Sequence, residues 1–305
     1  MYEEGGGHIA GFLGVMPRRL TMNRRQFQAA ISSQFVVDPG SRPAIVAVAL
    51  AKAFLDGPQD LSISDEANDT SRRIWEALGG TTALLHSLHW TRPLRPARFA
   101  LSLLRERSNL RALAAAAGPL ALAVDAVATR LPQSHLCQTR PGVSAVDDLT
   151  EHTVLAYFPT FVRVGALRVE YDEQTLRWVL DRARHRRVED EFRSAVIRNN
   201  RRIIGWYLFH VDRSGLAQVL QIAADHAGIA DVLDHLFYQA GEHGAVAVTG
   251  RLEPRFLQAL SDKYCVMHRR GPWVLLNARR AELLHSFECG DAVFSRLDGE
   301  WSLGF

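Results

Sequence analysis

The chain has 305 residues, 47% of them apolar and 23% charged, as expected of a globular protein with room for two domains. Its formal net charge of +3 is too small to indicate a nucleic-acid or anionic-membrane surface. The cysteines, Cys137, Cys265 and Cys289, lack metal or redox spacing and favour a reducing, cytoplasmic location. No secretory signal opens the chain, and the Ala-rich stretch 112–128, interrupted by proline and aspartate, indicates helices rather than a membrane span. We therefore expect no bound metal, nucleic acid or membrane span.

Strands and helices alternate through the first 95 residues. The strands follow from β-forming residues bounded by glycine and proline, and the helices from apolar residues at helical spacing. Gly5, Gly6 and Gly7 are typical of a hairpin turn, and Ser41 and Asn68 are suited to cap helices. The expected strands are 7–16, 26–37, 61–64 and 82–90, and the expected helices are 41–55 and 68–78.

Residues 96–150 break this alternation and are expected to form a helical connector. The alternation returns in residues 151–305. The expected helices there are 176–196, 229–240 and 252–260, and the expected strands are 202–211, 217–224, 245–248 and 273–276. Helices that alternate with strands predict an α/β fold with mixed sheets. Because both halves share one order of elements, we expect a duplicated domain, with 1–95 as the first copy and 151–305 as the second.

The turn after the strand 26–37 carries the clearest chemical signal. There the strand runs through Asp38 and Gly40 directly into a helix. Helix N-termini leave backbone N–H groups unpaired and bind phosphates well, and Arg42 adds a charged partner. Small side chains at Ala44 and Ala47 let a bulky ligand approach the backbone. A strand–helix unit that binds nothing would explain the same residues.

This segment resembles motif A of the GNAT acyltransferases, where Gln/Arg-x-x-Gly-x-Gly/Ala cradles the pyrophosphate of CoA. The matching residues here are Arg42-Pro43-Ala44-Ile45-Val46-Ala47, in which Ile45 replaces the first glycine and is expected to crowd the pyrophosphate. A second match, from Asn68 through Trp75 to Gly79, resembles the family's helix beside the pantetheine arm. The resemblance is best over residues 7–95. It implies that acetyl-CoA or another acyl-CoA is bound by Phe35, Val36, Val37, Arg42, Pro43, Ala44, Ile45, Val46, Ala47, Asn68 and Trp75.

Catalytic residues are harder to place from the resemblance. The family's base is often a carboxylate on the strand before the phosphate loop, and strand 26–37 has none. The remaining candidates are Asp65, Glu66, His86 and His89, although a role as a solvated turn or strand residue explains each of them more simply. The family's tyrosine, which can protonate the CoA thiolate, is replaced by Trp75, whose indole has no useful acidity.

The second half is expected to be degenerate. Its loop 224–231 has two aspartates and no basic residue, so we expect no CoA there. Residues 298–301 are expected to form a packed terminal hairpin, and the arginines of 182–202 a solvated helix face rather than an RNA site. The helices that usually wall the family's acceptor site have no counterpart before residue 7. We therefore expect the acceptor between the halves, lined by the candidate catalytic residues.

Two functions remain open from the sequence. The first is transfer of an acyl group to an amine or hydroxyl of a small molecule, glycan or peptide. Tandem GNAT domains also occur in the Fem-type transferases of cell-wall synthesis. The second is a non-catalytic acyl-CoA-binding or interaction module, which Ile45, Trp75 and the missing strand carboxylate favour. The oligomeric state does not follow from the sequence.

Overall fold

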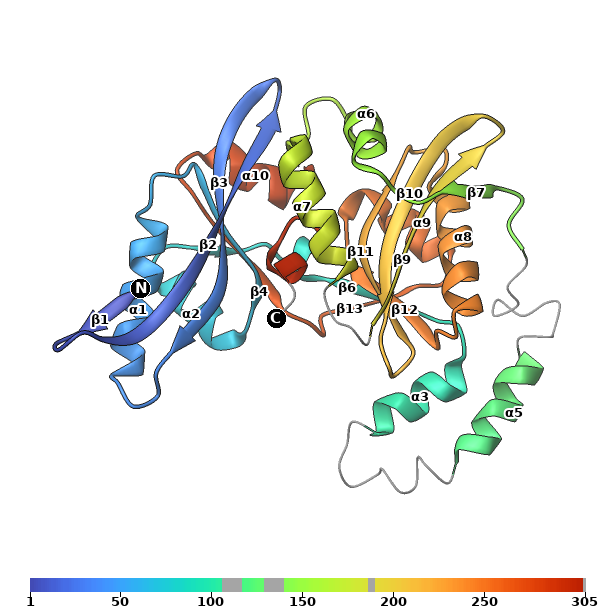
Figure 1. The fold of residues 1–305 in the computed structure, drawn as a ribbon, viewed down its shortest axis with the longest axis horizontal. Helices are drawn as coiled ribbons and strands as arrows, with labels where there is room; N and C mark the ends of the chain where they lie inside the picture. The colour runs from blue at the N-terminus through green and yellow to red at the C-terminus, as the bar shows by residue number, and fades with distance from the viewer. Residues whose placement is uncertain (106–116, 129–139, 186–189, 304–305) are drawn as a thin grey trace.

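The computed structural model describes residues 1–105, 117–128, 140–185 and 190–303 (Figure 1). Residues 106–116 and 129–139 of the expected helical connector, Cys137 among them, lie outside these ranges. The described part contains two β-sheets that stand side by side, one mostly from the N-terminal half and one mostly from the C-terminal half (Figure 1).

Both sheets are mixed, with parallel and antiparallel neighbours. The first has the order β15 (Ala292–Val293), β8 (Leu167–Val169), β2 (His8–Met22), β3 (Arg25–Val37), β4 (Leu61–Ala67), β14 (Trp273–Ala278), β5 (Thr81–Thr82), with β1 (Tyr2–Glu4) paired to β2. The second has the order β13 (Val266–His268), β6 (His89–Pro93), β12 (Ala247–Arg251), β11 (Leu216–Ala224), β10 (Arg202–Val211), β9 (Glu191–Asn199), β7 (Ser144–Asp147).

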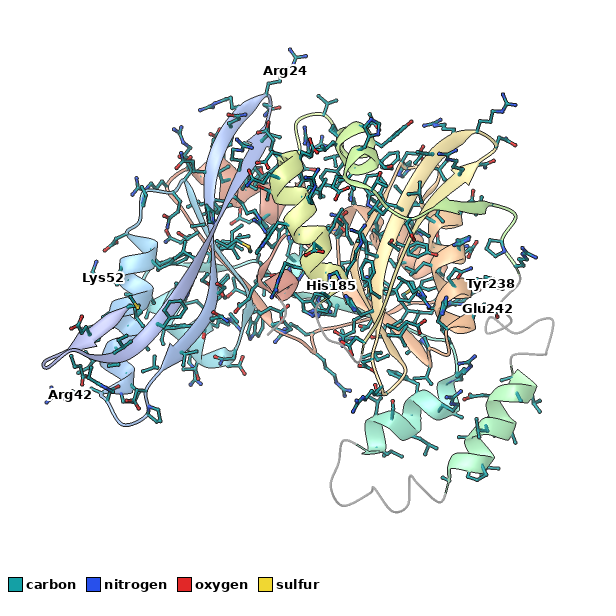
Figure 2. All side chains as sticks on the ribbon, viewed as in Figure 1. Arg24, Arg42, Lys52, His185, Tyr238 and Glu242 are labelled. Atoms are coloured by element: carbon teal, nitrogen blue, oxygen red, sulfur yellow. The ribbon has the colours of Figure 1, made fainter. Side chains whose placement is uncertain are left out.

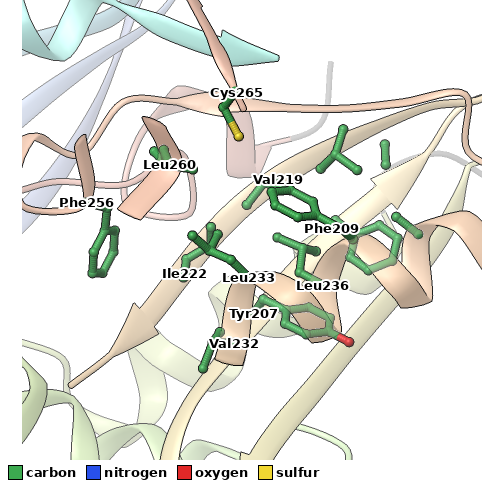
Figure 3. Close-up of a cluster of buried hydrophobic side chains, with 14 of the residues drawn as sticks. Tyr207, Phe209, Val219, Ile222, Val232, Leu233, Leu236, Phe256, Leu260 and Cys265 are labelled. Atoms are coloured by element: carbon green, nitrogen blue, oxygen red, sulfur yellow. The ribbon is translucent and has the colours of Figure 1, made fainter. Parts of the chain in front are cut away.

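Most of the helices pack on the faces of the two sheets, whereas the helices of residues 96–105 and 118–128 pack on each other away from the sheets (Figure 1). The helices are α1 (Pro43–Leu55), α2 (Asp69–Ala77), α3 (Pro96–Arg105), α5 (Gly118–Ala128), α6 (Glu151–Phe161), α7 (Glu173–Arg184), α8 (Ile229–Glu242), α9 (Leu257–Asp262) and α10 (Ala281–Glu288), with 3₁₀ turns η1 (Leu85–Ser87), η3 (Pro254–Phe256) and η4 (Glu300–Leu303). On the first sheet, α1 and α2 pack on one face and α10 on the other. Figure 3 shows the core of the second sheet, where α8 packs on β10 and β11.

The two sheets exchange a strand. β6, which follows the first half's helices in the chain, pairs with β12 and β13 of the second sheet. β14, from the last part of the chain, pairs with β4 and β5 of the first sheet. Each exchanged strand buries its apolar side chains in the core of the sheet that it joins: Trp90 of β6 in the second sheet and Leu275 of β14 in the first. The expected division at residues 95 and 151 therefore does not separate two closed sheets.

Several expected elements differ in the structure. The helix expected over 176–196 ends at Arg184, and β9 begins at Glu191. The strand expected over 82–90 is divided into β5, the turn η1 and β6. Strand β2 continues through Pro17 to Met22, because β8 pairs with β2 only at Leu20 and Thr21 and leaves one side of the proline unpaired, a position where proline is tolerated.

The C-terminal turn also differs from the expected hairpin. The turn η4 packs between the sheets, in contact with β3, β4 and α7. Trp301 is buried with Leu176 and Leu180 of α7, so the turn is held by the core of the second half.

Candidate functional site

The first sheet opens where β3 and β4 end. The two strands pair in parallel at Ala29–Leu61, Ala30–Ser62 and Ile31–Ile63 and then diverge. A bulge in β3 adds to the divergence, because Gln34 and Phe35 together oppose the single residue Leu13 of β2. Gln34 has a φ of 50°, in the left-handed region. Such an opening exposes backbone groups that a continuous sheet would use in its ladder.

A groove lies in front of this opening. Its volume is about 500 Å³, large enough for part of an extended ligand. It is lined by Phe35, Val37, Pro43, Ala44, Ala47, Val48, Asn68, Thr70, Ser71 and Ile74. Six of the residues predicted to bind the cofactor therefore line one groove: Phe35, Val37, Pro43, Ala44, Ala47 and Asn68. The small side chains of α1 keep it open, as their spacing predicted.

The N-terminus of α1 lies at this groove and is suited to an anion. Its N-cap residue, Arg42, makes no side-chain cap hydrogen bond, and the first turn holds no acidic residue. The N-cap is thus Arg42 rather than the expected Ser41. Arg42 lies at the outer end of α1 (Figure 2). The helix dipole and the guanidinium both favour a phosphate at this position.

One carboxylate, Asp38, lies in the loop before α1. It accepts a hydrogen bond from the Gly40 N–H at 2.8 Å and from His8 at 2.8 Å. The Gly40 N–H, and then the His8 ring, hold the pKa of Asp38 below its ordinary value. The charge of Asp38 therefore has local partners, which weakens its repulsion of an anion at Arg42.

Five of the predicted cofactor residues do not line the groove: Val36, Arg42, Ile45, Val46 and Trp75. Val46 and Trp75 are buried in the core between α1, α2 and the sheet, where Trp75 packs on Phe54 with ring centroids 5.8 Å apart. The expectation that Trp75 faces the pantetheine arm is therefore wrong. Adjacent helical residues point about 100° apart, so Ile74 lines the groove and Trp75 does not.

The side chains of Val36 and Ile45 point away from the groove into solvent. Ile45 is 54% exposed. Ile45 therefore does not narrow the groove, and its expected crowding of the pyrophosphate stays a prediction. Its replacement of a family glycine needs no positive φ, because the residue is an ordinary helical one in α1.

Asp65 is fully buried and ion-paired, so it is not an accessible base. Its Oδ2 accepts hydrogen bonds from Nη1 and Nη2 of Arg251, each at 3.1 Å, and its Oδ1 accepts one from the N–H of Glu300 at 2.8 Å. Nη2 of Arg251 also donates to the carbonyl oxygen of Asp65 at 2.7 Å. Because Arg251 belongs to β12, this ion pair joins the two sheets. Nothing in the sequence around Asp65 indicates this partner, which lies 186 positions away along the chain.

Glu66 remains partly accessible at the edge of this cluster. Its side chain is 26% exposed and lies 3.4 Å from Arg251. Arg296 is buried nearby; burial lowers the pKa of its guanidinium, and the charge of Glu66 opposes that shift. Of the two predicted carboxylates on β4, Asp65 is buried and Glu66 is reached by solvent.

The two candidate histidines lie away from the groove. Nε2 of His86 is 3.0 Å from the carbonyl oxygen of Ala292, and burial lowers the pKa of His86 to about 4. His89 is on β6 in the second sheet, stacked on His268, and burial followed by the charge of Arg296 lowers its pKa to about 3. Both rings are neutral at pH 7. Their burial fits a packing role, so the expectation that His89 lines the site is not supported by its position.

The segment after β15 enters the openings of both sheets. In the second sheet, β11 and β12 pair in parallel only at residues 216–218 and 247–249 and then diverge. The N–H of Leu297 donates to the carbonyl oxygen of Leu220 at 3.2 Å, beyond the last pair. In the first sheet, the bulge N–H of Gln34 donates to Oε1 of Glu300 at 2.6 Å. Residues 297–300 thus connect the two openings, and the sequence alone did not indicate this.

The equivalent position in the second half differs from expectation in one respect. The loop after β11 borders a hollow of about 630 Å³ that is also lined by the β9–β10 turn, residues 199–202. That turn brings Arg202 to 2.8 Å from Asp225. A basic residue is therefore present in space although the loop itself has none. Asp225 neutralises the charge of Arg202, and Asp231 lies in the first turn of α8. The absence of CoA from this position stays a prediction.

Over the ranges that the structure covers, no three His, Cys, Asp or Glu side chains gather in a way that could hold a metal ion. None of the helices in those ranges has the length and apolar character needed to cross a bilayer.

Comparison with known proteins finds similar proteins by structure alone. No family profile and no curated protein matches the sequence. A protein of Enterococcus faecalis V583 described as a probable N-acyltransferase aligns with 92% of this chain at TM-score 0.53 and 11% identity. A GCN5-related N-acetyltransferase of Anabaena variabilis aligns with 89% at TM-score 0.53 and 10% identity. The fold is that of the GNAT acyltransferases.

The structure of N-myristoyltransferase of Saccharomyces cerevisiae with bound myristoyl-CoA and inhibitors aligns with 89% of the chain at TM-score 0.52 and 10% identity. The aligned region spans 60%, 60% and 65% of these three structures, so each is longer than the part it shares. The expected α/β fold and GNAT resemblance are confirmed.

Proposed function

We propose that the protein transfers an acyl group from acetyl-CoA or another acyl-CoA to an amine or hydroxyl. The observation that carries this proposal is the groove between α1 and α2, which begins at an uncapped helix N-terminus and ends at the opening between β3 and β4. The GNAT fold of the chain supports the same reaction class.

The groove residues fit the parts of an acyl-CoA. The α1 N-terminus and Arg42 suit the pyrophosphate, because both offer positive charge or N–H donors. The apolar sides of Phe35, Ala47 and Ile74 suit an extended, mostly apolar arm. Backbone N–H groups of β3 near the bulge would stabilise the negative charge that develops on the thioester oxygen. CoA supplies the activated acyl group, and the chain's own residues position it.

The acceptor approaches from the side of the second sheet in this proposal. Glu66, at the end of β4, is the accessible candidate to contact it, whereas Asp65 holds the sheets together. A small molecule, a glycan and a peptide all remain candidate acceptors. The division into residues 1–95, 96–150 and 151–305 is retained only as a description of chain order, because β6 and β14 cross it.

A second candidate is a non-catalytic acyl-CoA-binding module. One observation favours it: Glu300 already accepts the hydrogen bond of the Gln34 N–H at the bulge. In this reading the C-terminal turn occupies the position where chemistry would occur, and the groove only senses acyl-CoA.

Calorimetry with CoA and an assay of thiol release with a panel of amines test both candidates. We expect one site per chain, and the Arg42→Glu variant should bind CoA about 10-fold or more weakly because a charge is reversed beside the phosphate. The matched control is Arg24→Glu at the far tip of the β2–β3 hairpin (Figure 2), which should bind normally. Two equivalent sites, or unchanged binding by Arg42→Glu, would reject the cofactor assignment. Tight binding without any thiol release would favour the non-catalytic module.

A further inference from the structure

Glu300 occupies the opening of the first sheet from the face opposite the groove. Side chains alternate along a strand, so Asp65 projects from the same face of β4 as Ile63, the face on which α10 packs. The N–H of Glu300 donates to Asp65, and its carboxylate accepts from the bulge N–H of Gln34. The next residue along β3, Phe35, lines the acyl-CoA groove. The groove leads to the opening between β3 and β4, and the Glu300 carboxylate is thus held at that opening on the opposite face of the sheet.

The position of Glu300 is fixed by its neighbours. The preceding residue must be glycine, since a Cβ at position 299 would lie 1.9 Å from Oδ2 of Asp65. The following residue, Trp301, is buried under α7. With both flanks anchored and Oε1 bound by Gln34, the carboxylate has a defined place, and Oε2 remains for a second partner.

The surroundings of Glu300 also raise the pKa of its carboxyl group to about 7. Burial is the largest effect on this pKa, and the Gln34 N–H, the next largest, acts in the opposite direction. The negative charges of Asp65 and Glu66 on β4 add to the rise. The face of α7 that meets the turn is apolar, with Leu176 and Leu180. A base with a pKa near the working pH exchanges protons most effectively.

We propose that Glu300 is the general base that accepts the proton of the acceptor during acyl transfer, a role that rests on the function proposed above. The acceptor nitrogen forms a bond to the thioester carbon, and the bond from that carbon to the CoA sulfur breaks. The proton of the attacking nitrogen moves to the Glu300 carboxylate. Glu300 then returns a proton to water, and the CoA thiolate takes one from water, so the products are an amide and free CoA.

This assignment explains why strand 26–37 lacks the carboxylate that the family often places there. The base comes instead from the C-terminal segment, which the ion pair of Asp65 and Arg251 helps to hold against the opening. Asp65 is in this view a positioning residue. Its negative charge contributes to the raised pKa of Glu300 without contact between the two carboxylates being required.

The test compares the full chain with Glu300→Gln, which keeps an acceptor for the Gln34 N–H but cannot take a proton. The rate of thiol release from acetyl-CoA is measured from pH 5.5 to 9 with the best amine of the panel, and CoA binding is measured by calorimetry. We expect kcat/KM at pH 8 to fall at least about 100-fold. The acidic limb of the pH profile, with an apparent pKa near 7, should disappear, and CoA affinity should stay within about threefold.

A matched control is Glu288→Gln, a substitution of an exposed glutamate at the end of α10, which should leave rate and profile unchanged. An active wild-type chain whose Glu300→Gln variant keeps the rate and the acidic limb would overturn the role of Glu300 alone. Absence of thiol release by the wild-type chain with every amine, despite CoA binding, would instead reject the proposed reaction and the base with it. A variant that also loses CoA affinity would show that Glu300 supports the groove structurally, which contradicts the proposal.

Discussion

Oδ2 of Asp65 lies so close to Gly299 that a Cβ atom added there would be 1.9 Å away. The close approach, rather than an unusual φ, is what requires glycine. The two residues come from different ends of the chain, and their contact seats the C-terminal turn against β4.

We predict that Gly299→Ala displaces the C-terminal turn. The added methyl group forces either the turn or the Asp65–Arg251 pair to move, at a cost of about 1–3 kcal/mol. Denaturant unfolding measures this cost, and thiol release should fall with it because Glu300 moves with its neighbour. Gly142→Ala is the control, since a Cβ there meets nothing within 4 Å. Unchanged stability of Gly299→Ala would mean that the turn is not seated as described.

The buried pair of Asp65 and Arg251 gives a prediction about coupling between the sheets. Both side chains are at most 2% exposed, so removing one partner leaves an uncompensated buried charge. Arg251→Met and Asp65→Leu should each cost about 3–5 kcal/mol of unfolding free energy. The double variant should cost clearly less than the sum, because neither member of the buried pair is left as a lone charge. Strict additivity of the two single effects in denaturant melts would contradict a direct ion pair.

Glu300 should make the protein less stable as the pH rises through neutrality. Its folded-state pKa is raised to about 7, so in the folded protein it keeps a proton that the unfolded chain releases near its ordinary value of 4.5. The stability linked to that proton is full below about pH 4.5 and is lost by about pH 8. Glu300→Gln should therefore gain about 1–2 kcal/mol at pH 8 relative to wild type, after allowance for solvent screening, and show no gain at pH 4.5. Thermal melts of both proteins at pH 4.5 and pH 8 measure this gain in stability. The same stability difference between variant and wild type at both pH values would mean that the Glu300 carboxyl group is more hydrated than described. A gain in stability together with a loss of rate is the pattern expected of a functional residue.

The groove predicts that a large side chain on α1 blocks acyl-CoA. Ala47 lines the groove, so Ala47→Trp should fill part of its volume and weaken CoA binding by at least about 10-fold. The fold should be retained, because the ring occupies a space that is open to solvent. Lys52→Trp on an exposed position of the same helix is the control and should bind CoA normally. Equal binding by both variants in calorimetry would place the cofactor elsewhere.

The groove between α1 and α2 was largely predictable because its signals are local. A proline at the first turn of α1, alanines one helical turn apart and an asparagine cap on α2 are read directly from neighbouring residues. The same local reasoning failed at Trp75, where the motif spacing pointed to the groove but the apolar face of α2 took the indole into the core. A match in motif spacing locates a helix well, but it predicts which residue faces a groove only to within one or two positions.

The remaining parts depend on contacts between distant segments. Arg251 and Glu300 reach Asp65 from 186 and 235 positions away, and nothing in the local sequence around either indicates a partner. The strand at 273–276 was expected from its apolar residues, but its place in the first sheet depends on which edge is open when the chain folds. Charge and periodicity therefore predicted the elements, and only the tertiary pairing revealed the ion pair of Asp65 with Arg251 and the C-terminal turn.

The exchanged strand β14 has a consequence for the order in which a newly made chain can fold. Until residues 273–278 leave the ribosome, β4 has no neighbour on its outer side and the short β5 has no partner to pair with. The first sheet therefore keeps an open edge at β4 until almost the whole chain has been synthesised, although most of its strands are made first. Such a dependence on late, distant pairing is typical of slow folding. We expect nascent chains that stop before β14 to be good clients of chaperones, and the two sheets to close together once the last segment arrives.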